Sequence, residues 1–374
     1  MPTGPRPSVY MASRQNFFVM ESNRAYRFLL KRLEKFREPI WGEHMVHHTP
    51  KRFLNYLLAN LEYKLGRLRL ISRPYQAFID PSDICNLNCP LCVARKGTQE
   101  RQNKCMMRLS DFKRVIDELS GHLYSIYLCN RGEPFLNPDI FEMIRYAKSK
   151  GIAVLVSSNL NIRIKNFGEK IVESGIDHIH VPIEGTDQET YAKYRRGGNY
   201  ALVRSNLREI LEAKKAAGSS KPYAVVGCIV MRHNEAGIAD FKKEMRTTGV
   251  DLVYIGRVLL KDYEKEKGWL PLNEDFNGYL PSGKRKQPFT NCSYPWTTAV
   301  IFPDMGVSFC CWNHYLDGER LIGSLRDGAF SDSWNSPAYA GIRRVLRDKA
   351  PNAKIPCSDC ISGHHPHKVE IEMV

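Results

Sequence analysis

The sequence contains no run of about 18 apolar residues that could span a bilayer, and residues 1–7 lead into no apolar segment of the kind that directs export. With 374 residues, the chain is also far longer than the small secreted domains whose many cysteines form a disulfide framework. We therefore expect a cytoplasmic protein whose 11 cysteines are reduced and able to bind metal. The length allows one main domain with appended modules.

Acidic residues are in deficit, since 40 Asp and Glu stand against 55 Lys and Arg and give a formal net charge of +15. This charge attracts anionic partners such as nucleotides, sugar phosphates and lipid headgroups. The sequence has no recognisable motif for binding DNA or RNA, so we expect no nucleic-acid partner. An anionic small molecule is one substrate class that fits the charge.

Three cysteines lie close together in the sequence, Cys85, Cys89 and Cys92, with the spacing Cys-x3-Cys-x2-Cys. Thiolates are the usual ligands of iron-sulfur clusters, and three of them leave one iron of a four-iron cluster with an open position. A closed zinc site normally needs four ligands in two separated pairs, and no fourth ligand is evident beside this triplet. Buried structural cysteines are the other alternative. The spacing favours a cluster with an open position.

From residue 75 to 285, strand-like apolar runs alternate with helical segments, which is typical of parallel strands joined by crossover helices. Six such units predict an α/β fold, a partial (βα)6 TIM-like barrel. In barrels, ligands gather at the C-terminal ends of the strands, and the cysteine triplet follows the first expected strand. The expected strands are 76–80, 123–129, 152–158, 178–183, 223–230 and 252–257, and the expected helices are 110–120, 138–149, 165–174, 187–216 and 237–247.

The triplet after the first strand and Gly132-Glu133-Pro134 after the second together resemble the radical S-adenosylmethionine (SAM) superfamily. The resemblance implies that SAM chelates the open iron and that Gly132, Glu133 and Pro134 hold its ammonium group. It also implies reductive cleavage of SAM to methionine and a 5′-deoxyadenosyl radical, which takes a hydrogen atom from the substrate. A low-potential electron donor, flavodoxin or ferredoxin, would then be a partner.

The next strand ends supply further residues that the resemblance assigns to the cofactor. Ser158 and Asn159 stand where relatives carry a Thr-Asn-Gly type segment near the ribose, and Leu160 replaces the glycine. Glu184 follows the fourth strand and is expected to bond hydroxyl groups of the ribose or the substrate. Arg195 lies in a segment in which relatives pair an arginine with the cofactor carboxylate.

Residues 286–374 contain a second set of cysteines in an order that is similar to the SPASM or shorter twitch extension of radical SAM enzymes. The resemblance implies one fully ligated auxiliary four-iron cluster that stores or passes an electron. A zinc ribbon is the alternative for the same residues. The expected ligands are Cys292, Cys357, Cys360 and either Cys310, which alignment on Asp304 and Val307 favours, or Cys311.

Two further cysteines, Cys129 and Cys228, lie in or near strand ends of the expected barrel. Either could point inward and give a hydrogen atom to a substrate radical. Most buried cysteines without a ligand are simply small apolar residues, so both are candidate hydrogen donors beside that ordinary role.

Residues 1–74 are predicted to form a helical and basic N-terminal extension. Within residues 51–69, apolar side chains recur at helical spacing between lysines and arginines. We expect this apolar face to pack on the main domain, as most such faces do, and contact with an anionic membrane surface is the alternative. The apolar positions are Phe53, Leu54, Leu57, Leu58 and Leu61.

These observations favour an oxidoreductase or epimerase that acts on a sugar, an aminocyclitol or a glycoconjugate, because a single auxiliary cluster suits the oxidation of a carbon radical beside oxygen. One alternative is a peptide maturase, which normally adds a leader-binding module with strands that residues 1–74 do not suggest. Another is modification of a lipid-linked substrate by an enzyme at the inner membrane face. A non-enzymatic zinc or nucleic-acid-binding protein would explain the cysteines and the charge but not the barrel motifs.

Overall fold

A computed structural model describes residues 49–92, 105–260, 262–286, 292–311, 322–326, 328–350, 357 and 370–373. Of the predicted N-terminal extension it therefore includes only residues 49–74, and Cys360 lies outside the described residues. Within the described ranges, none of the helices is both long enough and apolar enough to cross a membrane.

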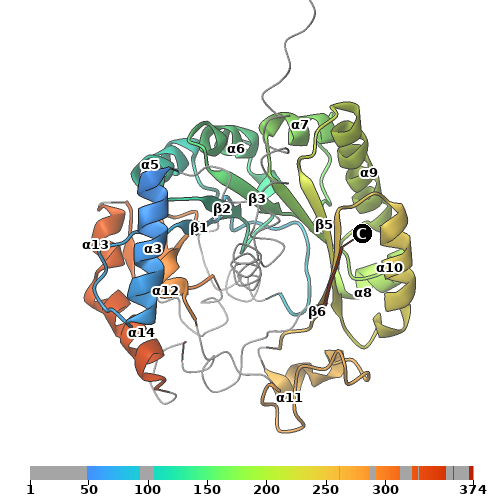
Figure 1. The fold of residues 1–374 in the computed structure, drawn as a ribbon. Helices are drawn as coiled ribbons and strands as arrows, with labels where there is room; N and C mark the ends of the chain where they lie inside the picture. The colour runs from blue at the N-terminus through green and yellow to red at the C-terminus, as the bar shows by residue number, and fades with distance from the viewer. Residues whose placement is uncertain are drawn as a thin grey trace, which may run out of the picture. The chain divides into compact units, whose positions relative to one another are not determined.

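The centre of the fold is a ten-stranded sheet with the order β10-β6-β5-β4-β3-β2-β1-β7-β8-β9. Strands β1 to β6 are parallel to one another and curve into an open barrel (Figure 1). Their side chains are buried on both faces, as expected for parallel strands covered by helices. The predicted partial barrel is confirmed. The strands are β1 Gln76–Ile79, β2 Ser125–Leu128, β3 Ala153–Ser157, β4 His178–Pro182, β5 Tyr223–Val230 and β6 Leu252–Arg257.

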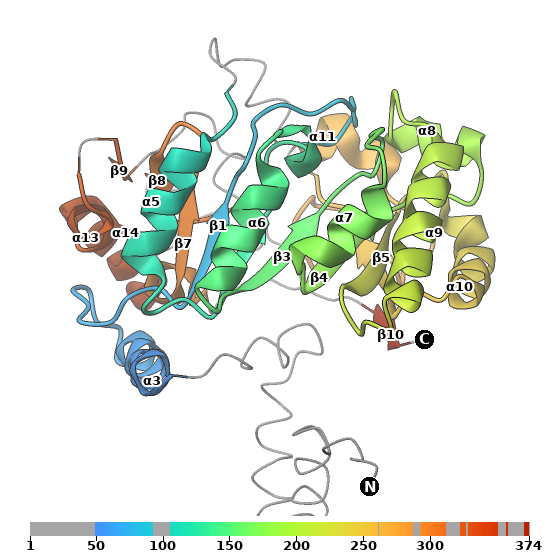
Figure 2. The ribbon, with the colours of Figure 1, turned by 90° about the horizontal axis from the view of Figure 1, so that it is seen from above.

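Crossover helices cover the outer face of the barrel strands (Figure 2). Several of these helices are followed by a residue with left-handed backbone angles, including Gly175 at φ 78° and Gly249 at φ 84°. Glycine is favoured at such positions because a residue with a side chain is strained there. These helices are α5 Leu109–Leu119, α6 Ile140–Ser149, α7 Phe167–Ser174, α8 Gln188–Tyr194, α9 Tyr200–Ala216 and α10 Ile238–Thr247, with shorter turns α11 Tyr263–Glu266, η2 Pro134–Leu136, η3 Glu235–Gly237 and η4 Lys267–Trp269.

The single helix predicted over 187–216 is two helices, α8 and α9. The chain turns between them at Gly197, whose φ is 84°. Asn199 then begins α9, since its side chain accepts a hydrogen bond from the backbone N–H of Leu202 at 2.9 Å. This break leaves Arg195 at the end of α8, close to the cysteine loop, where Asn88 N–H donates to the carbonyl of Arg196 at 2.8 Å.

The C-terminal region extends the barrel sheet at both edges, which the sequence analysis did not anticipate. Strand β7 pairs in parallel with β1, with Gln76 opposite Thr298. At the other edge, β10 pairs antiparallel with β6. The elements of this region are α12 Tyr294–Thr297, β7 Thr298–Ile301, β8 Gly306–Ser308, β9 Gly323–Ser324, α13 Phe330–Trp334, α14 Pro337–Asp348 and β10 Glu370–Met373.

The fully buried side chain of Arg343 joins the C-terminal region to the segment before β1. Its Nε donates to the carbonyl of Pro295 at 2.8 Å, and its Nη1 donates to that of Leu68 at 2.9 Å. The guanidinium lies 4.8 Å from the ring centroid of Trp334 and 4.6 Å from that of Tyr339. Burial lowers the pKa of Arg343 to about 10, so the group remains a cation at neutral pH and the aromatic rings stabilise its charge.

Helix α3 (Pro50–Lys64) packs on the barrel through its polar side. The Arg52 guanidinium donates to the carbonyls of Ser120 at 2.9 Å, Lys150 at 2.8 Å and Gly151 at 2.5 Å, at the ends of α5 and α6. The apolar face that we expected to pack on the main domain is instead exposed, and Leu54 retains 64% of its accessible surface. That expectation was wrong because Arg52 satisfies several helix-end carbonyls that an apolar side chain could not.

We expect Arg52→Met to lower the free energy of unfolding by about 3 kcal/mol, because the helix-end carbonyls of Ser120, Lys150 and Gly151 lose charge-assisted hydrogen bonds. The exposed neighbour Lys51 supplies a matched control, and Lys51→Met should change the stability by less than about 0.5 kcal/mol. Urea denaturation followed by circular dichroism measures both. Equal stability of the two variants would show that α3 does not depend on its polar face.

Candidate functional site

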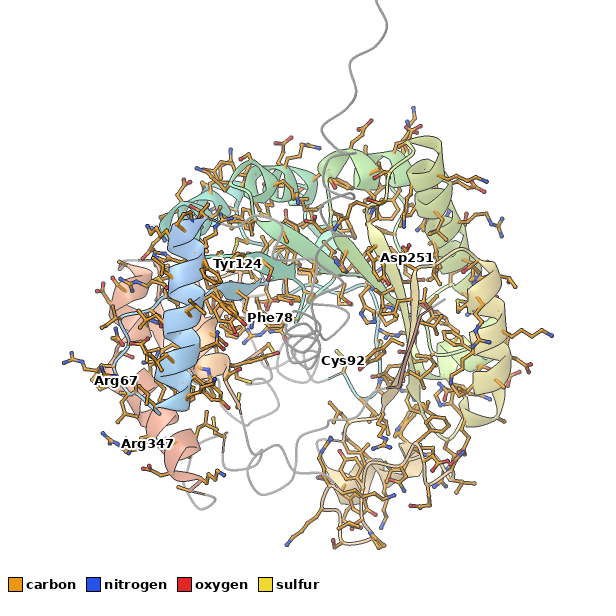
Figure 3. The ribbon with its side chains drawn as sticks, in the orientation of Figure 1. Arg67, Phe78, Cys92, Tyr124, Asp251 and Arg347 are labelled. Atoms are coloured by element: carbon orange, nitrogen blue, oxygen red, sulfur yellow. The ribbon has the colours of Figure 1, made fainter. Side chains whose placement is uncertain are left out.

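A cavity of about 540 Å³ lies at the C-terminal ends of the barrel strands. Figure 3 shows Cys92 inside the arc of strands. The cavity brings together residues that the sequence analysis assigned to one site from four separate segments. Its lining includes Cys85, Cys89, Cys92, Cys129, Gly132, Glu133, Ser158, Asn159 and Arg195, all of them predicted, together with Ser157, His180, Pro182 and Ile229.

The three cysteines of the triplet line the same cavity. Burial raises the pKa of Cys85, and it raises that of Cys89 to about 12, so metal binding must displace protons. Donors stand ready for the thiolates: Asn159 Nδ2 is 3.7 Å from the sulfur of Cys85, and Arg195 Nη1 is 3.9 Å from that of Cys89. Over the described ranges, no three His, Cys, Asp or Glu side chains converge on a point where they could hold a single ion.

Glu133 is fully buried beside the triplet and is held by three donors. Its carboxylate accepts from Ser158 Oγ at 2.7 Å, from the N–H of Asn159 at 2.8 Å and from the N–H of Phe135 at 3.2 Å. Burial nevertheless raises its pKa to about 7. A carboxylate offers about four acceptor positions, so one remains for a cation such as the ammonium group of SAM. Pro134 begins the turn η2 that follows.

The backbone just before Glu133 packs too tightly for a larger residue. A Cβ atom on Gly132 would lie 2.2 Å from the carbonyl oxygen of Ser82, so only glycine fits between the second strand end and the cysteine loop.

Leu160, where the resemblance led us to compare a glycine, has a left-handed φ of 52°. Its fully buried side chain and the hydrogen bond from its N–H to Ser158 Oγ at 3.0 Å keep this conformation in place.

Arg195 and Glu184 form a buried pair at the edge of the cavity. The carboxylate of Glu184 accepts from Arg195 Nη2 at 2.9 Å and from Arg195 Nε. The remaining Nη1 faces the thiol of Cys89. Glu184 is fully buried, and its pairing with two guanidinium nitrogens orients the arginine. Arg195 lines the cavity beside the cysteine loop, and Glu184 contacts its guanidinium. The predicted contact of Glu184 with hydroxyl groups of the ribose or the substrate stays a prediction.

His180 on the cavity wall was missed by the sequence analysis. Its Nδ1 is 3.0 Å from Ser157 Oγ, and burial lowers its pKa to about 4, so the imidazole is neutral at physiological pH. Gly227 on the neighbouring strand makes room for the ring, since a Cβ there would lie 2.4 Å from His180 Nε2. The alternation of side chains along β4 could have indicated this position, because it puts His180 on the same face as Pro182.

The two candidate hydrogen donors occupy different places. Cys129 lines the cavity, and burial, with a further contribution from the charge of Asp80, raises its pKa to about 12. Its sulfur therefore keeps its hydrogen at neutral pH. Cys228 is 1% exposed and packs in the main hydrophobic core. It does not line the cavity within the described part of the chain.

The second cysteine set lies in the C-terminal region. Cys292, Cys310 and Cys357 contact the same hydrophobic core. Cys311 belongs to a separate small cluster with Val300 and Phe302. Burial raises the pKa of Cys311 well above its usual value, and the neighbouring Cys310 and Cys129 add to the rise. Cys311 does not line the cavity within the described part of the chain.

Thiols and a buried carboxylate thus lie together at the strand ends of an open α/β barrel. This is the arrangement of enzymes that hold an iron-sulfur cluster at the mouth of the barrel. Residues 79–244 match the model of the radical SAM superfamily, and residues 292–361 match the SPASM iron-sulfur cluster-binding domain. The chain belongs to the radical SAM superfamily and carries a SPASM domain. The predicted SAM and iron-sulfur cofactors are thereby confirmed.

Three known proteins illustrate the likeness. GTP 3′,8-cyclase of Alkaliphilus metalliredigens is 21% identical over 178 residues, which are 47% of this chain and 54% of the cyclase. The match therefore spans about half of that enzyme. Mycofactocin maturase MftC of Mycobacterium ulcerans is 28% identical over 307 residues, 75% of this chain and 78% of MftC. Streptococcus suis SuiB, bound to its precursor peptide SuiA, shares the fold with a TM-score of 0.56 at 14% identity, over 78% of this chain and 71% of SuiB.

We expect Glu133→Gln to change how the stability of the cluster-free protein depends on pH. Burial raises the Glu133 pKa from 4.5 to about 7, so between these values the folded state binds a proton that the unfolded state has released. Wild-type stability should therefore fall as pH rises from 5 to 8, by on the order of 3 kcal/mol relative to the variant. Urea denaturation of both proteins at pH 5 and pH 8 measures the difference. An equal change in stability with pH in the wild type and the variant would contradict the raised pKa of Glu133.

Proposed function

We propose that this chain is a radical SAM maturase that modifies a peptide. The observation that carries the proposal is the likeness to MftC, because it extends across both the barrel and the cysteine-rich C-terminal region. The name of that relative describes a maturase. The fold shared with SuiB, which was solved with a precursor peptide, is compatible with the same substrate class. A sugar or aminocyclitol substrate remains a prediction that the experiment below distinguishes.

The residues of the cavity have distinct tasks in this proposal. When bound, the cluster and SAM supply reductive cleavage to methionine and a 5′-deoxyadenosyl radical that takes hydrogen from a carbon of the substrate. Cys85, Cys89 and Cys92 hold the cluster. Glu133, ionised when a cation lies beside it, accepts the ammonium of SAM. Arg195 directs a guanidinium N–H toward the Cys89 thiolate and lowers the cost of its charge.

Other residues that line the cavity can contact the substrate. His180 and Ser157 form a neutral polar pair, and Ile229 adds an apolar contact. Cys129 also lines the cavity with a protonated thiol, from which a substrate radical can take a hydrogen atom; the thiyl radical left behind then needs one electron, from the low-potential donor, and one proton to become a thiol again. Cys228 is the weaker candidate for that role, because the core encloses its sulfur and Asn234 Nδ2 lies 3.8 Å from it.

For the auxiliary cluster we propose Cys310 rather than Cys311 as the ligand beside Cys292 and Cys357. Cys292, Cys310 and Cys357 all pack with the main hydrophobic core. Cys311 packs instead in the small cluster with Val300 and Phe302. Cys310 therefore shares the surroundings of Cys292 and Cys357. Cys360 completes the predicted set.

Reconstituted wild-type protein should contain about eight irons per chain, as two four-iron clusters require. We expect Cys310→Ala to reduce this to about four, because an auxiliary cluster with three thiolates is held poorly. Cys311→Ala is the matched control and should keep about eight. Iron and sulfide analysis after anaerobic reconstitution measures all three proteins. Loss of iron in the Cys311 variant alone would assign the ligand the other way, and zinc in place of iron would contradict the cluster.

The substrate class can be tested by transfer of deuterium. The reconstituted enzyme receives SAM, a chemical reductant and a perdeuterated short peptide encoded beside its gene, and mass spectrometry follows 5′-deoxyadenosine. We expect deuterium in the 5′-deoxyadenosine, because the radical takes its hydrogen from the substrate carbon.

The control protein carries Cys85→Ala, Cys89→Ala and Cys92→Ala together and should form no 5′-deoxyadenosine above background. Deuterium transfer from labelled sugars or aminocyclitols, with none from the peptides, would overturn the maturase proposal and support the predicted dehydrogenase or epimerase.

A further inference from the structure

Helix α3 presents an apolar stripe to the outside of the domain. Leu54, Leu57, Leu61 and Leu65 recur along one side of the helix and keep 64%, 48%, 52% and 63% of their accessible surface. Ile71, just beyond the helix, is 76% exposed. In Figure 1, α3 lies at the outer side of the domain, where it contacts α12. A contiguous apolar surface of this kind usually marks a place of contact with a partner.

The opposite side of α3 is polar and fixed, so the helix cannot turn to bury the stripe against its own domain. Asn55 Nδ2 donates to the carbonyl of Arg73 at 2.9 Å, and Asn55 Oδ1 accepts from the Arg73 N–H at 2.8 Å. Glu62 accepts from the N–H groups of Ile71 at 2.8 Å and Ser72 at 3.1 Å. Rotation of the helix would break these bonds together with those of Arg52, and would leave buried polar groups without partners.

The surface around the stripe is cationic. Lys51, Lys64, Arg67 and Arg69 are all exposed, and Figure 3 shows Arg67 at the outer edge of the domain. Glu62 is the one acidic residue within residues 49–73, and it is only 2% exposed. The exposed surface of this segment therefore combines leucines and cations without a negative side chain.

We propose that α3 docks on the surface of an anionic phospholipid bilayer, with its leucines at the headgroup and acyl boundary and its lysines and arginines at the phosphates. This combination of an apolar stripe with flanking cations is what holds an amphipathic helix in a membrane interface. The inference concerns where the enzyme works and does not rest on the proposed peptide substrate.

Charge distinguishes this partner from the two other surfaces that could cover the stripe. Residues 1–46 contain 8 Lys and Arg against 4 Asp and Glu, so covering α3 with them would bring like charges together. A second copy of α3 would do the same. An anionic lipid surface supplies both the apolar environment and the opposite charge.

The test is co-sedimentation of the full-length protein with vesicles of phosphatidylglycerol and phosphatidylcholine, and with vesicles of phosphatidylcholine alone. Wild-type protein should pellet with the anionic vesicles and much less with the neutral ones, and added salt should weaken binding because it screens the charges. Leu57→Glu with Leu61→Glu should reduce partition to the anionic vesicles at least tenfold, since it removes apolar contacts and adds negative charge.

The matched control is Leu272→Glu with Leu280→Glu, two leucines in another part of the molecule that are 71% and 42% exposed. This control should bind the anionic vesicles as the wild type does. Wild-type protein that stays in the supernatant with anionic vesicles would overturn the proposal, as would equal binding by the α3 variant.

The other occupants have their own signatures. If residues 1–46 cover the stripe, the α3 variant should melt well below the wild type without vesicles, as a core substitution does. If a second copy covers it, the wild type should be a dimer in solution and the variant a monomer. Either result would overturn the proposal. Unchanged melting and unchanged oligomeric state in the variant, with lost vesicle binding, would support it. Formation of 5′-deoxyadenosine, measured in parallel, shows whether the radical site is intact and keeps the two proposals separate.

Discussion

Glu133 sits where three strand ends meet, and its contacts fix their relative positions. Its backbone N–H donates to the carbonyl of Ile84 at 2.8 Å, next to the first cysteine of the triplet, while its carboxylate binds the segment after β3 through Ser158 and Asn159. Asn159 in turn reaches the thiol of Cys85. A buried carboxylate is costly unless its charge is balanced, so the group that organises the loops also creates a demand for a cation in the cavity. The cofactor site and the geometry of the loops thus depend on the same residue.

The sequence was sufficient to locate the barrel strands and the strand-end residues because local patterns determine both. Buried parallel strands are short apolar runs, and Gly175 and Gly249 mark helix ends whatever the tertiary contacts are. The join between α8 and α9 was missed because the periodicity of both helices continues through it, and the left-handed Gly197 is visible only as one glycine of a pair. His180 was missed for a different reason. The sequence does not show which side chains surround a histidine in a strand, and those side chains decide whether it faces a cavity.

The errors concern contacts between segments that are distant in sequence. The apolar stripe of α3 follows the ordinary rule for a helix that packs on a core, yet the polar face is the one that packs, because Arg52 meets carbonyls at the ends of α5 and α6 that are about 70 to 100 residues away. Nothing in the local pattern of residues 50–64 shows those carbonyls. The pairing of strand β7 also depends on distant contacts. A strand of four residues does not identify its partner strand from sequence. Its pairing with β1 depends on α14, whose buried Arg343 holds the C-terminal region against the segment before β1.

The pairing of β7 with β1 also brings the segment after β7 against the loop after β2. Phe78 of β1 stacks on Tyr127 of β2 with ring centroids 4.6 Å apart, and the guanidinium of Arg131 lies 3.2 Å from the ring centroid of Phe302 just after β7. Cys129, two residues before Arg131, lines the cavity, and Cys311 packs in one cluster with Phe302. Because β7 and β8 continue the sheet of the barrel, the described part of the SPASM domain is built onto the barrel strands, and packing at this join reaches residues close to both sets of cysteines.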